Sequence, residues 1–196
     1  MPRTAISGLI VLVLATAALP ALAHEEGGIA GGFISGFLHP IFGWDHVAAM
    51  VAVGLWGAFL GQPAIWQLPV VFPAVMAVGG AMGVAGIALP EVETGIAASA
   101  LVLGLMVALA VRPPLVVAAV LVGIFAIFHG HAHGTELPEA ANPVAYAGGF
   151  VLGTGLLHLC GIGFGLLSRW RAGTYAIRAG GGVIALAGLG FLTGSL

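Results

Sequence analysis

The run PLVVAAVLVGIFAIFHG at residues 114–130 decides the fold class, because none of its side chains carries a full charge. A helix that crosses the hydrocarbon core of a bilayer needs about 20 mainly apolar residues. The whole chain has the same character: hydrophobic residues make up 60%, charged residues 6%, and the mean hydropathy is +1.16. A soluble domain carries about 25% charged residues. We therefore predict an all-α integral membrane protein.

Five more apolar stretches lie on either side of this run, and proline, glycine or short polar segments separate them. A chain of 196 residues has no length left for a separate soluble module. We predict one transmembrane domain over residues 24–196 with six helices. The predicted spans cover about 29–60, 67–89, 94–111, 114–130, 143–167 and 175–195.

The first 23 residues have the features of an export signal. Arg3 supplies the positive start, Ile6 to Leu19 form an apolar segment, and Ala21-Leu22-Ala23 is a small-residue cleavage box. We predict a cleaved signal peptide over residues 1–23, which leaves His24 as the new N-terminus. The alternative is an uncleaved first transmembrane helix.

Charge sorting predicts the orientation. If the mature N-terminus lies outside, three arginines (Arg112, Arg169 and Arg171) fall in inner loops, as the positive-inside rule requires. We predict a multi-pass protein of the bacterial inner membrane with both mature termini on the periplasmic side. The carboxylates outside the spans all fall on the outer face together with three histidines: Glu25, Glu26, Glu91, Glu93, Glu136, Glu139, His24, His131 and His133.

An outer face of this composition attracts positive ions. The positive-inside rule alone would explain the absence of outer arginines, but it does not explain histidines beside the acids. A net charge of −2 shows no basic excess, so nucleic acid is excluded as a partner. The chain also has no lysine to complete an ATP-binding P-loop.

The first predicted span is too long for a straight crossing. Its thirty or so residues would measure about 50 Å as a helix, because each residue adds about 1.5 Å, whereas the hydrocarbon core is about 30 Å thick. The sequence His39-Pro40-Ile41-Phe42-Gly43-Trp44-Asp45-His46 marks the break. Proline removes a backbone donor there and glycine loosens the next turn. We predict a kinked or discontinuous first helix.

Two imidazoles and a carboxylate lie at this break. His39 and His46 would stand about 10 Å apart on a continuous helix, so they can share an ion only if the break folds them together. Asp45 is the only acid within a predicted span. An intramembrane charge of this kind indicates metal or proton binding. The alternative is that Asp45 only caps the helix that begins near Gly43.

A second histidine cluster ends the fourth span, in Phe128-His129-Gly130-His131-Ala132-His133-Gly134-Thr135-Glu136. On a helix, His129 and His133 are i,i+4 neighbours, which can bring two imidazoles onto one ion, with Glu136 one turn further on. The two glycines could instead make the segment a loop that still gathers the imidazoles. A solvated polar loop is the alternative without a metal.

His158 lies among glycines in the fifth span, near Cys160, the single cysteine of the chain. The residue could continue a metal path inward from the outer cluster. A buried structural histidine and a small buried thiol are the competing interpretation.

The chain resembles the HupE/UreJ family. The resemblance rests on His39-Pro40-x-x-Gly43-x-Asp45-His46, on Phe128-His129-Gly130-x-Ala132-His133-Gly134-x-Glu136 and on an exported N-terminus that begins at His24. This family is associated with nickel uptake for hydrogenase and urease maturation, and some members with cobalt. The resemblance implies a nickel or cobalt permease. It implies that the motif residues bind the ion: His39, Asp45, His46, His129, His133 and Glu136.

We therefore expect ATP-independent uptake of a divalent transition metal, with Ni²⁺ or Co²⁺ as the transported ion and no permanently bound cofactor. We do not expect an enzyme. The candidate metal ligands are the six motif residues with His24, His131 and His158 added. Three alternatives remain: an accessory protein that captures metal without transporting it, an intramembrane zinc-dependent hydrolase, and a haem protein with His46 and His158 as axial ligands. The partners are the metal ion and the lipid bilayer, and a homo-oligomer is left open.

Overall fold

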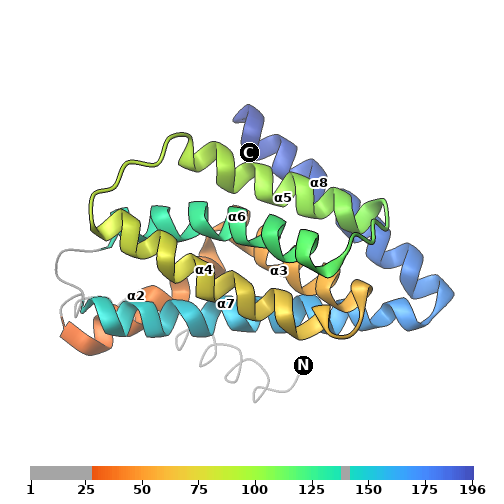
Figure 1. Ribbon diagram of the computed structural model, residues 1–196, viewed down its shortest axis with the longest axis horizontal. Coiled ribbons are helices and arrows are strands. Elements are labelled where there is room, and N and C mark those ends of the chain that lie inside the picture. The colour runs from red at the N-terminus through yellow and green to blue at the C-terminus, as the bar shows by residue number, and fades with distance from the viewer. Residues whose placement is uncertain (1–27, 138–141) are drawn as a thin grey trace, which may run out of the picture.

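The computed structural model describes residues 28–137 and 142–196, so the predicted signal peptide, its cleavage site and His24 lie outside the described residues (Figure 1). The described part is helical throughout and contains no strand. Its elements are α2 (Gly28–Phe42), α3 (Trp44–Leu60), α4 (Ala64–Val84), α5 (Val92–Ala108), α6 (Leu115–Thr135), α7 (Pro143–Gly165), the 3-10 helix η2 (Leu166–Arg169) and α8 (Arg171–Thr193).

Each predicted apolar stretch corresponds to a helix or, for the first, to a pair of helices. Four helices are long and apolar enough to cross a membrane, namely α4, α6, α7 with η2, and α8. The bent pair α2 and α3 adds a fifth span if it crosses as one unit. The apolar helix α5 has 17 residues and is shorter than these spans. The helices are those of a membrane protein, and the count of six spans stays a prediction.

Helix α4 ends earlier than the apolar pattern predicted, and a glycine explains why. Gly86 has φ +70°, and the N–H groups of Gly86 and Ile87 donate to the carbonyls of Gly83 and Met82. This pair of bonds closes a helix at a left-handed residue, where glycine has no steric cost. The apolar residues that follow therefore belong to the connection to α5.

Helix α6 continues through its glycines to Thr135, so the second motif is helical rather than a loop. The reason lies in the neighbouring helix. A side chain at Gly130 would collide with the backbone of Met76, and one at Gly79 would collide with the backbone of Ile127. The glycines of α4 and α6 thus let the two backbones approach directly, as small residues do between membrane helices.

The helices pack in three groups, in which α4 and α6 run parallel, α2 and α3 run parallel to α7, and α5 and α8 run antiparallel (Figure 1). Helix α4 packs mainly on α6, α5 on α8, and both α2 and α3 on α7. The largest buried side chains of the shared core include Trp56, Phe72, Met50, Leu68 and Leu103. In Figure 1 the α4–α5 connection and the C-terminal end of α6 lie at one end of the bundle, and the connections α3–α4, α5–α6 and α7–α8 lie at the opposite end.

Candidate metal site

The chain breaks at Gly43, between α2 and α3, and the two helices are bent by 78°. Pro40 lies inside α2 and cannot donate a backbone hydrogen bond. Gly43 is extended (φ −81°, ψ 106°), and its carbonyl accepts from Val47 N–H in the first turn of α3. The break places His39, in the last turn of α2, beside His46, in the first turn of α3. Their ring centroids are 5.9 Å apart.

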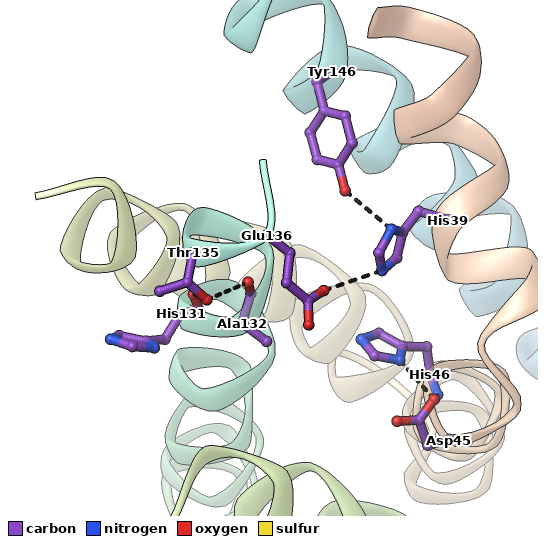
Figure 2. A network of polar contacts seen from close by, with 8 residues as sticks. All are labelled: His39, Asp45, His46, His131, Ala132, Thr135, Glu136 and Tyr146. Carbon is purple, nitrogen blue, oxygen red and sulfur yellow. Dashed lines mark hydrogen bonds and ion pairs between the residues drawn. The ribbon is translucent and has the colours of Figure 1, made fainter. Parts of the chain in front are cut away.

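Asp45 fixes the orientation of the His46 ring. One carboxylate oxygen, Oδ1, lies 2.8 Å from the backbone nitrogen of His46 and 2.8 Å from its Nδ1 (Figure 2). Because an ionised carboxylate only accepts hydrogen bonds, Nδ1 must carry the proton. The lone pair is then on Nε2, which is buried and has no hydrogen-bond partner among the described residues. Carboxylates commonly orient metal-binding imidazoles in this way.

The structure is compatible with both interpretations of Asp45, the helix cap and the role in metal binding. It lies in the first turn of α3 and accepts a backbone N–H there, as the capping interpretation requires. It also holds His46 with a free Nε2. The same oxygen, Oδ1, makes both contacts, so Asp45 orients His46, and its role as a direct metal ligand stays a prediction.

The second motif supplies the third imidazole. The ring of His133, on α6, lies 4.7 Å from that of His39 and 4.7 Å from that of His46, measured between centroids. One nitrogen from each ring lies within 4.8 Å of the other two. Both nitrogens of His133 are buried and have no hydrogen-bond partner in the described part of the chain. We call His39, His46 and His133 the three-histidine cluster.

Two further side chains complete the outer rim of this cluster (Figure 2). The Tyr146 hydroxyl shares a hydrogen bond of 3.2 Å with Nδ1 of His39. A Glu136 carboxylate oxygen lies 3.7 Å from Nε2 of the same ring. The side chains of His39 and Glu136 are 34% and 53% exposed, whereas His46 is buried. The cluster thus has one accessible side, and a carboxylate stands there.

An apolar pocket adjoins His133. It has a volume of about 250 Å³ and lies between α4, α6 and α7. His133 lines it together with Met76, Tyr146 and Phe150. The Phe150 ring packs directly on His133, with centroids 4.0 Å apart. Apolar walls of this kind keep the surroundings of a metal site dry and strengthen its electrostatic contacts.

His129 lies one turn deeper than His133 on α6, and its ring centroid is 4.9 Å from that of His46. Ser99 fixes the protonation of this imidazole. The Ser99 hydroxyl donates to the Ile96 carbonyl at 2.6 Å, so its oxygen accepts from Nε2–H of His129 at 2.9 Å. Nδ1 of His129 is then left with a lone pair. It is buried and without a hydrogen-bond partner among the described residues.

The structure does not gather all predicted ligands. The His131 ring points away from the cluster in Figure 2, and its Nε2 donates to the Ile87 carbonyl at 2.7 Å. His158 is buried on α7, apart from the three-histidine cluster. Cys160 is exposed on the outside of the helix bundle. His24 lies outside the described residues.

Sequence reasoning missed the residues that hold the imidazoles in place. Tyr146, Ser99 and Phe150 each contact a cluster histidine or its neighbour, but they come from helices other than the two motifs. A serine within an apolar span is the one signal that could have directed attention to Ser99, because polar side chains in such spans usually have a bonding role.

Comparison with known proteins gives a consistent assignment. A family model described as "HupE / UreJ protein" matches residues 11–191. The chain is similar to "Protein HupE" of Rhizobium leguminosarum bv. viciae, with 49% identity over 186 residues, which cover 94% of this chain and 97% of that protein. No solved structure matches the chain.

Proposed function

Because this chain belongs to the HupE/UreJ family, we propose that it carries a divalent nickel or cobalt ion inward across the bacterial inner membrane. The ion would supply maturation of a hydrogenase or a urease. The family is an accessory and transport family rather than a family of enzymes. The finding that carries the proposal is the set of three imidazole nitrogens within 4.8 Å of one another.

The chemistry of the cluster supports a divalent transition metal. Imidazole suits nickel, zinc and copper, and thiolate ligands, which would favour Cu(I), are absent from the cluster among the described residues. Burying Nε2 of His46 and both ring nitrogens of His133 without hydrogen-bond partners among the described residues costs free energy, about 1–3 kcal/mol for each unsatisfied group. A bound ion would use these lone pairs. The free energy lost by leaving them unpaired would be recovered when the site is filled.

Charge placement supports inward movement. Glu136 directly follows α6, beside the accessible rim of the cluster. Arg112 lies between α5 and α6, and Arg169 and Arg171 lie at the junction of η2 and α8, at the opposite end of the bundle. With the acidic end outside, a divalent ion entering the cell gains about 4.6 kcal/mol per 100 mV of membrane potential, twice the value for a single charge. That energy can drive uptake without ATP.

A second function is favoured by the exposed rim. His39 and Glu136 are accessible enough to collect an ion from outside, so the chain could capture metal as an accessory protein without transporting it. Such a protein would bind nickel but would not raise the nickel content of the cell.

Uptake measurements separate the two functions. Cells that lack other nickel importers would express this chain alone and receive radiolabelled nickel, cobalt or zinc. Transport predicts accumulation by the wild type, and loss to background in His46→Gln at unchanged protein abundance. His131→Gln is the matched control, because glutamine can still donate to Ile87 and His131 is not in the cluster. Metal binding by purified protein without accumulation in cells would establish capture instead.

A further inference from the structure

A second group of unpaired polar atoms lies deeper in the bundle, on α7. His158 is 1% exposed and Thr154 is fully buried. The two residues are one helical turn apart and share a face of the helix. Both ring nitrogens of His158 and the hydroxyl oxygen of Thr154 lack hydrogen-bond partners in residues 28–137 and 142–196. Native proteins rarely leave such groups unpaired, and each instance calls for an explanation.

The facing helix contributes a free backbone oxygen to the same place. In α4 the carbonyl of Pro69 would accept from residue 73, but that residue is also proline and has no N–H. The His158 ring lies close enough to this carbonyl for a weak hydrogen bond, although neither ring nitrogen meets strict hydrogen-bond geometry. The imidazole of His158 and the Pro69 carbonyl therefore meet between α4 and α7, and the Thr154 hydroxyl lies one turn away on the same face of α7 without a partner among the described residues.

This group is separate from the three-histidine cluster. The His158 backbone packs against Gly54 of α3, and Gly54 lies eight residues beyond His46, about 12 Å along the helix. The Phe72 ring lies between His129, which is next to the three-histidine cluster, and His158. It makes an edge contact with His129 at 5.4 Å on one side and with His158 at 5.5 Å on the other. One ion cannot reach both the three-histidine cluster and the His158 group at once.

His129 lies between the three-histidine cluster and the His158 group. Its ring centroid is 4.9 Å from that of His46 and 5.4 Å from that of Phe72. The Ser99 contact leaves the Nδ1 lone pair of His129 available. Conduction through a membrane protein needs sites that bind an ion well enough to admit it and weakly enough to release it. A series of sites with different ligands meets that requirement better than one tight site.

We propose that His158, Thr154 and the Pro69 carbonyl form a second, inner binding position for the transported divalent metal ion, reached from the three-histidine cluster by way of His129. This inference rests on the proposed function. The inner position offers one imidazole and two neutral oxygens, and the three-histidine cluster offers three imidazoles. Divalent nickel and cobalt bind imidazole more strongly than neutral oxygen, so the inner position is the weaker of the two.

The test counts bound ions. The full-length protein, reconstituted in lipid nanodiscs and freed of metal, is titrated with Co²⁺ in equilibrium dialysis. The wild type is expected to bind two ions with different affinities. His158→Leu is expected to bind one, with the tighter dissociation constant unchanged and nickel uptake reduced by roughly tenfold or more. His46→Gln is expected to lose the tighter ion and to keep the weaker one.

A second variant guards against misfolding of His158→Leu. Thr154→Val keeps the shape of the side chain and removes only the hydroxyl, so it is expected to weaken the second ion while the first stays unchanged. His131→Gln serves as the control for replacing a buried histidine and is expected to bind two ions.

The outcomes also separate this inference from the proposed function. A wild type that binds one ion, together with wild-type uptake in both His158→Leu and Thr154→Val, would overturn the inner position and leave the transport proposal standing. The unpaired atoms would then hold only water. A wild type that binds no Co²⁺ and accumulates no nickel would overturn both.

Discussion

Asp45 orients the His46 ring, and that contact gives a prediction for the replacement of one carboxylate oxygen by an amide nitrogen. In Asp45→Asn the side-chain oxygen can still accept the backbone N–H, because asparagine caps helices about as well as aspartate. The negative charge that strengthens the imidazole as a ligand is lost. We expect nickel affinity to fall by about 10–100-fold while the amount of protein in the membrane stays near wild type.

The measurement is Ni²⁺ binding by the purified variant, with membrane abundance determined by immunoblot. Asp45→Glu is the matched control for charge, since it keeps the carboxylate but moves it by one methylene. Wild-type affinity in an abundant Asp45→Asn protein would limit Asp45 to the cap.

Ala110 gives a residue-scale test of backbone strain. It ends α5 with φ 56°, and the N–H groups of Ala110 and Val111 donate to the carbonyls of Val107 and Met106. Gly86 ends α4 with the same pattern of bonds. A left-handed conformation costs a non-glycine residue about 1–2 kcal/mol. We expect Ala110→Gly to raise the thermal unfolding midpoint in detergent and Gly86→Ala to lower it.

The two substitutions exchange alanine and glycine in opposite directions at equivalent helix ends, so each is the control for the other. Shifts of the same sign in both variants would contradict this account of the helix ends. Nickel binding should be unchanged in both, because neither residue lines the three-histidine cluster.

At the scale of helices, the glycines between α4 and α6 carry a second stability prediction. A methyl group at Gly79 would collide with the backbone of Ile127, and a backbone cannot rotate aside as a side chain can. Gly79→Ala should therefore separate the helices and destabilise the protein by about 1–3 kcal/mol. Gly148, on α7, has open space around it. Gly148→Ala should be neutral or stabilising by up to about 1 kcal/mol.

Unfolding midpoints of the two variants in the same detergent decide this point. Equal and small effects at both positions would mean that the close approach of α4 and α6 does not depend on glycine at position 79.

Helix placement was largely predictable from the sequence, because an apolar run of spanning length has few other uses. The break in the first span was predictable too, since Pro40 and Gly43 interrupt it at a charged residue. The end of α6 was not, because Gly130 and Gly134 can either end a helix or let another helix approach. Only the position of α4 decides between the two. The meeting of His133 with His39 and His46 likewise depends on packing between helices far apart in the chain.

At the scale of the whole molecule, the arginine and glutamate placement predicts orientation. A phosphatase reporter, active only after export, should be active when fused after Leu196. The same reporter inserted after Arg112 should be inactive, and a reporter that works only in the cytoplasm should give the opposite pattern. Phosphatase activity of the fusion at Arg112 would show that the protein has the opposite orientation to the predicted one. It would also place the acidic rim of the cluster on the cytoplasmic side.

The glycine contacts also divide the molecule mechanically. Backbone touches backbone between α4 and α6, at Gly79 and Gly130, and between α7 and its partners α2 and α3, at Gly149 and Gly161. Interfaces packed this closely resist sliding, so each group should move as a solid piece. His39 and His46 belong to one piece and His133 to the other. An ion held by all three histidines would cross-link the two groups of helices. Its release would leave the two groups free to move relative to each other.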